Sequence, residues 1–122
     1  MSSQNKNTLK SGENFMKTFL VLLKEKSMER LDDKLLNEHI QHLHKLSKSK
    51  NLLLCGPFAD DSGAMLVIQA DSRMTVDFLI QSDPFVKNSY YGSYTITEFY
   101  KADESNNYLM DHDQTIGELN KK

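Results

Sequence analysis

The stretch that decides the fold is residues 52–70, LLLCGPFADDSGAMLVIQA. Two apolar runs, residues 52–55 and 64–70, are separated by Gly56-Pro57 and by the turn residues Asp60-Asp61-Ser62-Gly63. Apolar runs of this length, bounded by Gly, Pro and Asp, are typical of strands, and a short connection between them favours an antiparallel hairpin. The centre of the chain is therefore predicted to be a β-hairpin.

The segments on either side of the hairpin alternate between strand and helix patterns. Residues 16–23 form an apolar run of strand length, and residues 32–48 repeat apolar side chains mostly every three or four positions after a capping aspartate. After the hairpin, Asp71-Ser72 offers a cap for a second helix that Pro84 ends, and residues 93–100 have the composition of a strand. This order predicts a ferredoxin-like α+β fold, βαββαβ, with an antiparallel sheet and two helices on one face. The predicted buried faces of the helices carry Leu35, Leu36, Ile40, Leu43 and Leu46, and Val76, Leu79 and Ile80.

The chain of 122 residues has room for one domain with a modest core. Residues 1–15 carry few apolar side chains and are predicted to be a flexible tail, because ordering them would bury little surface. The domain itself is expected to cover residues 16–102. Residues 103–122 are expected to be a C-terminal extension that docks on its own domain or on a partner.

Composition and charge exclude several classes of function. The net charge of -2 without a basic block argues against nucleic acid as a partner. The mean hydropathy of -0.56 and the absence of a long apolar run argue against a membrane span, and the polar start lacks a signal-peptide pattern, so a cytoplasmic protein is expected. The single cysteine, Cys55, lies in an apolar run and is expected to be a buried thiol, which suits a reducing compartment.

The second face of the predicted sheet needs a cover. Tyr94, Ile96 and Tyr100 alternate along the last strand, and the first and third strands are too apolar to leave a whole face in water. A second copy packing sheet against sheet would cover it through a self-complementary interface. The chain is therefore predicted to form a homodimer through the open sheet face.

His39 is a candidate for chemistry. At about 100° per residue it falls between Leu35 and Ile40, inside the apolar arc of the first helix. His42 and His44 point in other directions, so no metal site is predicted. A histidine inside an apolar arc has two interpretations: it bonds a backbone carbonyl as a core residue, or it moves a proton on a bound molecule.

Asp83 is the candidate partner of His39. It continues the apolar face of the second helix in register with Val76 and Leu79, and a buried carboxylate needs a partner such as an imidazole. Alternatively, Asp83 caps a short turn that begins with Pro84. If the two side chains pair, Asp83 fixes the tautomer of His39, and the pair is suited to general acid/base catalysis.

Three stretches together carry a family resemblance. They are His39 with the later LLLCGP of residues 52–57, the Asp-Pro-Phe-Val of residues 83–86, and the strand of residues 94–99. In order and spacing they resemble the YciI-like (YCII-related) family, a branch of the dimeric α+β barrel superfamily, over residues 16–101.

The resemblance implies a ferredoxin-like fold, a homodimer, and a site formed by His39 and Asp83 in a pocket between helix and sheet. A few members of the family act on small cyclic or chlorinated aromatic compounds. The sequence also departs from the family pattern. Leu36 stands where many relatives carry an arginine, one turn before the helix histidine, and Lys50 stands where a glycine is common.

These observations predict a small-molecule enzyme of the isomerase, lyase or hydrolase type that acts on a small, possibly cyclic, metabolite. Phe58, Phe85 and Tyr94 are the predicted substrate contacts. No cofactor is predicted, because no cofactor-binding motif is found. The alternative is a noncatalytic dimer that binds a small ligand, or one in which both polar residues serve stability.

Overall fold

A computed structural model describes residues 16–110 of the chain. The predicted tail, residues 1–15, and residues 111–122 of the C-terminal extension lie outside the described residues. In the described part of the chain, no helix has the length and apolar character needed to cross a bilayer.

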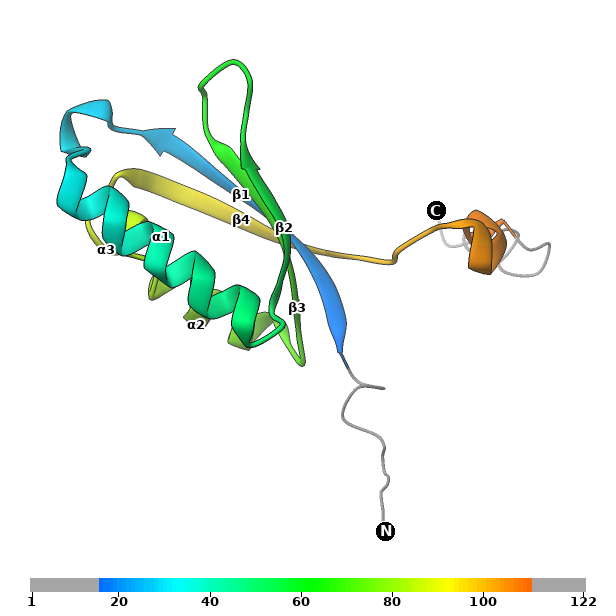
Figure 1. The fold of residues 1–122 in the computed structure, drawn as a ribbon. Helices are drawn as coiled ribbons and strands as arrows, with labels where there is room; N and C mark the ends of the chain where they lie inside the picture. The colour runs from blue at the N-terminus through cyan, green and yellow to red at the C-terminus, as the bar shows by residue number, and fades with distance from the viewer. Residues whose placement is uncertain (1–15, 111–122) are drawn as a thin grey trace, which may run out of the picture.

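The elements follow one another in the predicted order, with one short α-helix and two short 3₁₀ helices added. Four strands form a single antiparallel sheet in the order β2-β3-β1-β4. Figure 1 shows the helices labelled α1, α2 and α3 together on one side of this sheet. The predicted ferredoxin-like α+β fold is thereby confirmed. The elements are β1 (Lys17–Lys26), η2 (Met28–Arg30), α1 (Asp33–Lys48), β2 (Leu52–Pro57), β3 (Ala64–Ala70), α2 (Arg73–Gln81), α3 (Pro84–Lys87), β4 (Tyr91–Phe99) and η3 (Glu104–Leu109).

The helices begin where polar side chains cap them. The Asp32 carboxylate accepts a hydrogen bond from the backbone N–H of Leu35 at 2.8 Å, and α1 starts at the next residue after this cap. Ser72 caps α2 in the same way through the backbone N–H of Thr75, at 3.2 Å. Helix α2 ends at Gln81, before the proline, and α3 then begins with the proline in its first turn.

The core lies between the sheet and the helices. On β1, Phe19, Val21 and Leu23 alternate toward the helices and are almost fully buried. Each such side chain contributes about 1.5–3 kcal/mol of burial free energy, which is enough to fix the register of this central strand. The other most buried apolar side chains are Leu66, Ile68, Ala70, Val76, Ile80 and Ile96.

Helix α1 is less covered than its apolar pattern predicts. Leu35 and Leu46 are buried and Leu43 is partly buried, but Leu36 and Ile40 are 39% and 41% exposed. The reason is that α1 packs against α3 and β2 near the edge of the sheet, so neighbouring elements cover only one stripe of the helix. The prediction that Leu36 and Ile40 lie in the core was wrong.

Two residues of β4 face the helices rather than the open side of the sheet. Ile96 pairs with Val21 and is buried, and Tyr94 pairs with Leu23 and donates its hydroxyl hydrogen to Asp77 of α2. Because paired residues in antiparallel strands share a face, both side chains belong to the helix side. The suggestion that Tyr94 and Ile96 contribute to the uncovered face was therefore wrong.

The face of the sheet opposite the helices nevertheless carries several apolar side chains, beside threonines of β4. Leu20 of β1 pairs with Val67 of β3, and Leu22 lies on the same face two residues further along. Leu54 of β2 and Phe99 of β4 extend this face to both edges and are 60% and 37% exposed. Among residues 16–110, no helix covers this side of the sheet, and Figure 1 shows η3 at the end of an extended segment that leads away from the sheet.

Candidate functional site

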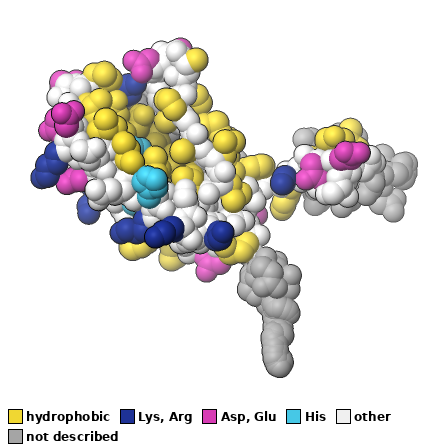
Figure 2. All heavy atoms as spheres, in the orientation of Figure 1, with side chains coloured by type: hydrophobic (Ala, Val, Ile, Leu, Met, Phe, Trp, Pro, Cys, Tyr) yellow, Lys and Arg dark blue, Asp and Glu magenta, His cyan; other side chains and the backbone are white. Residues whose placement is uncertain are grey.

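A cavity of about 270 Å³ lies between α1 and the β2–β3 hairpin. Most of its wall is apolar, and Figure 2 shows hydrophobic side chains gathered around a hollow on this side of the molecule. The polar groups at the wall are the side chains of His39, Lys26, Tyr90 and Tyr91. An apolar cavity with a few convergent polar groups is the usual character of a small-molecule site.

His39 is held from two sides. Its Nδ1 lies 2.8 Å from Oδ1 of Asp83, and its ring stacks on Phe85 with centroids 3.8 Å apart and an angle of 8° between the planes. A carboxylate accepts the hydrogen of Nδ1–H, so in the neutral ring Nε2 is the nitrogen that can accept a proton. Among residues 16–110, Nε2 makes no hydrogen bond to the protein.

Asp83 serves both of the roles that its position in the sequence suggested. Its Oδ1 accepts the backbone N–H of Phe85 at 2.9 Å, which caps α3, and the same oxygen accepts from His39. The side chain is 1% exposed, so both bonds are shielded from water. The alternative in which His39 bonds a backbone carbonyl does not describe this structure, because the partner of Nδ1 is a carboxylate.

The other histidines of α1 are placed differently. Nε2 of His42 lies 3.2 Å from the backbone oxygen of Leu79, between α1 and α2, and burial lowers the pKa of this imidazole. His44 is exposed. Within residues 16–110, no three His, Cys, Asp or Glu side chains are grouped in a way that could hold a metal ion.

The predicted substrate contacts are not all at the cavity. Phe85 lines it and stacks on His39. Phe58 lies in the β2–β3 turn, outside the lining, and Tyr94 bonds to Asp77 and Gln81 of α2 instead. Tyr94 faces the helices but points away from the cavity, because α2 provides the partners of its hydroxyl group.

Lys26 is a cavity residue that the sequence pattern did not reveal. Simple alternation along β1 would place Lys26 on the same face as Leu22 and Lys24, opposite to Leu23. The backbone of Glu25 has φ of 58°, in the left-handed region, and Lys26 instead lines the cavity together with Leu23. No sequence signal announces this irregularity, because glutamate is not a residue that favours positive φ.

Tyr90 and Tyr91 form an aromatic pair directly before and at the start of β4. Both side chains are buried and line the cavity. Their ring centroids lie 4.4 and 5.8 Å from that of Phe85, so one aromatic ring separates them from His39. The clustering of aromatics after Asp83-Pro84 is the signal that could have indicated them.

Cys55 is not the buried thiol that its apolar run predicted. β2 is an edge strand of the sheet, and the side chain of Cys55 is exposed and lines the cavity. Partial burial against the cavity wall raises the pKa of the thiol. The thiol is therefore protonated at neutral pH, which does not favour a role as nucleophile.

The fold and this cavity define the chain as a ferredoxin-like α+β protein with an apolar cavity between α1 and the sheet. It belongs to the YCII-related domain family, whose sequence profile matches residues 16–100. Among solved structures it is similar to 5-chloro-2-hydroxyhydroquinone dehydrochlorinase (TftG) from Burkholderia phenoliruptrix AC1100, in complex with 2,5-dihydroxybenzoquinone. The two chains share 22% sequence identity with a TM-score of 0.58, and the match covers 74% of this chain and 99% of that chain. A weaker similarity, with 9% identity, a TM-score of 0.44, and coverage of 75% of this chain and 57% of the other, is found to PH0061. No curated protein matches the sequence significantly.

Proposed function

We propose that this protein is an enzyme in which His39, oriented by Asp83, transfers a proton to or from a small molecule bound in the cavity. The observation that carries the proposal is the 2.8 Å contact between Nδ1 and an almost fully buried carboxylate. A carboxylate in this position holds the imidazole in one tautomer and one orientation, and Nε2 is left for the substrate.

The reaction class that suits this arrangement is general acid/base chemistry, as in isomerisation, elimination or hydrolysis. The cavity of about 270 Å³ suits a single substituted ring, since a cavity of about 150 Å³ accepts benzene. The similarity to a dehydrochlorinase supports the same class, because loss of hydrogen chloride requires removal of a proton. A small cyclic compound is therefore the proposed substrate.

The proposal is tested with His39→Gln, Asp83→Asn and the double variant on a panel of small cyclic compounds that includes chlorinated hydroquinones. Turnover is expected to fall by about 10²- to 10⁴-fold in each single variant, as for the loss of one general acid/base group. The double variant is expected to be no slower than the singles, because the two residues act as a unit. His44→Gln, an exposed change on the same helix, is the matched control.

Retention of the full rate in His39→Gln would contradict the proposal. Saturable binding without turnover of any compound would instead favour the second candidate, a noncatalytic ligand-binding protein. That candidate draws its support from the same apolar cavity, which would hold a ligand whether or not His39 moves a proton.

We also propose that two copies of the chain pair through the open face of the sheet. The support is the apolar character of that face, where Leu20, Leu22 and Val67 lie together near the centre and Leu54 and Phe99 lie at the edges. Apolar side chains grouped in this way are rarely left in water, and a second copy covers them symmetrically.

A further inference from the structure

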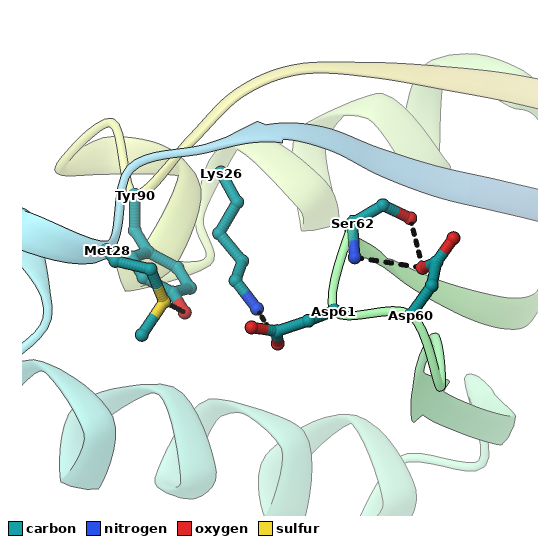
Figure 3. A network of polar contacts seen from close by, with 6 residues as sticks. All are labelled: Lys26, Met28, Asp60, Asp61, Ser62 and Tyr90. Carbon is teal, nitrogen blue, oxygen red and sulfur yellow. Dashed lines mark hydrogen bonds and ion pairs between the residues drawn. The ribbon is translucent and has the colours of Figure 1, made fainter.

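Lys26 brings a positive charge to the wall of an otherwise apolar cavity. Its side chain is 11% exposed and extends from β1 toward α1 (Figure 3). Its ammonium group bonds to the carboxylate of Asp61, which belongs to the turn between β2 and β3. The hydrogen bond to Asp61 is the main reason that the pKa of Lys26 lies above its ordinary value. Lys26 is therefore a cation at neutral pH.

The ammonium group of Lys26 has N–H donors that are not used in hydrogen bonds to residues 16–110. It carries three N–H donors, and among residues 16–110 only Asp61 accepts a hydrogen bond from it. Asp61 is 74% exposed and belongs to the β2–β3 turn, outside the cavity lining. Among the residues that line the cavity, Lys26 is the one permanent charge. A partly buried cation with unused donors favours a ligand that carries a negative charge.

We propose that Lys26 binds an anionic oxygen of the substrate, so that the ligand is a single planar ring bearing a phenolate, enolate or carboxylate group. Phe85 stacks on His39, and Lys26 is paired with Tyr91 across β1 and β4, so aromatic rings that line the cavity and offer contacts to a flat molecule lie beside both groups. The role of Lys26 in positioning the ring for His39 rests on the proposed function. The anion site itself does not, because it requires only the cavity and the charge.

Asp61 holds Lys26 in place and competes with the ligand. The turn that carries it is tied by hydrogen bonds from Phe58 N–H to the oxygen of Gly63 at 2.8 Å and from Asp61 N–H to the oxygen of Phe58 at 2.9 Å. Asp60 accepts from both the N–H and the hydroxyl group of Ser62 (Figure 3). Because these bonds fix the turn, Asp61 is preorganised beside Lys26, and its negative charge opposes an anion bound at the same ammonium group.

The test measures the binding of two ligands of nearly equal size, 4-nitrophenolate and neutral 4-nitroaniline, by calorimetry at mildly alkaline pH. Lys26→Met is expected to weaken 4-nitrophenolate binding by about ten- to a hundredfold, as for the loss of a hydrogen bond to a charged group, and to leave 4-nitroaniline binding nearly unchanged. Lys17→Met, the same change on an exposed residue at the start of the same strand and outside the open sheet face, is the matched control. Asp61→Asn is expected to strengthen anion binding a few-fold, and Lys26→Arg is expected to retain it.

Equal affinity of the wild type for the two ligands, or an anion preference that survives in Lys26→Met, would overturn the inference. A preference lost in His39→Gln but kept in Lys26→Met would assign the anion to His39 and would also overturn it. The two proposals fail separately. Full turnover in His39→Gln with anion binding lost in Lys26→Met would reject the catalytic proposal alone. If circular dichroism shows that Lys26→Met is unstable, the affinity of Asp61→Asn for 4-nitrophenolate becomes the deciding measurement. If Asp61→Asn does not bind 4-nitrophenolate more tightly than the wild type, the proposed anion site is contradicted.

Discussion

The orientation of His39 depends on one oxygen atom. Oδ1 of Asp83 accepts both from His39 Nδ1 and from the backbone N–H of Phe85, whose ring in turn stacks on the imidazole. The cap of α3 and the position of the imidazole are therefore coupled, because any shift of this carboxylate moves both partners. The aspartate that caps α3, a common role at the start of a helix, thus also fixes the orientation of His39.

His42 gives a prediction about stability and pH. Burial lowers its pKa below the ordinary value of 6.5, although nearby Asp83 acts in the opposite direction. The folded state then binds fewer protons than the unfolded state around this pH, so stability rises with pH through the ordinary imidazole range and is lost as the pH falls through the lowered pKa. His42→Gln, which keeps an amide donor for Leu79, is expected to flatten this dependence in urea unfolding at several pH values. His44→Gln should keep the wild-type slope, and an unchanged slope in His42→Gln would contradict the assignment.

At the scale of single elements, the β2–β3 turn depends on one glycine. A Cβ atom at Gly63 would lie 2.2 Å from the backbone oxygen of Leu23, a contact that requires the turn or β1 to move. Gly63→Ala is expected to lower the free energy of unfolding by roughly 1–3 kcal/mol, as overpacking of a tight site does. Gly56→Ala in the same hairpin is the control, because nothing lies within 4 Å of its Cβ position. Equal denaturation midpoints for the two variants would show that the turn yields at little cost.

Helix α1 contributes an apolar residue where the family resemblance suggested that a cation is common. Leu36 lies in the cavity wall, and the cation of this cavity comes from Lys26 on β1 instead. The position of this cation on β1 rather than α1 matters because β1 is a central strand, paired with β3 on one side and with β4 on the other. A charge on this strand is held by the sheet, whereas a charge on α1 would lie near the exposed side of the helix.

At the scale of the whole molecule, the open sheet face predicts the state of association. Light scattering at micromolar concentration is expected to give twice the chain mass of 14.0 kDa. Leu20→Lys, near the centre of this face, is expected to give the monomer, because an unpaired charge would be buried between the sheets. Met74→Lys on α2, where the side chain is 81% exposed, should leave the dimer intact. A wild-type protein that scatters as a monomer throughout this range would rule out the proposed pairing.

The sequence by itself determined the order of the elements, the ferredoxin-like fold and the family. It also placed the start of the first helix at Asp32 or Asp33 and that of the second at Asp71-Ser72, where the structure has the caps at Asp32 and Ser72, and it singled out His39 and Asp83. These features follow from local rules: apolar periodicity, capping side chains and turn dipeptides act over a few residues and can be read without knowing what lies nearby.

The tertiary structure alone decided what surrounds His39. The positive φ of Glu25 turns Lys26 into the cavity, α2 provides a partner that directs Tyr94 away from it, and the edge position of β2 leaves Cys55 exposed. The bond between His39 and Asp83 likewise joins two helices that are distant in the chain. Which face a strand residue takes, and whether that face is covered, depends on backbone irregularities and on packing between distant segments. Patterns within one segment do not contain this information.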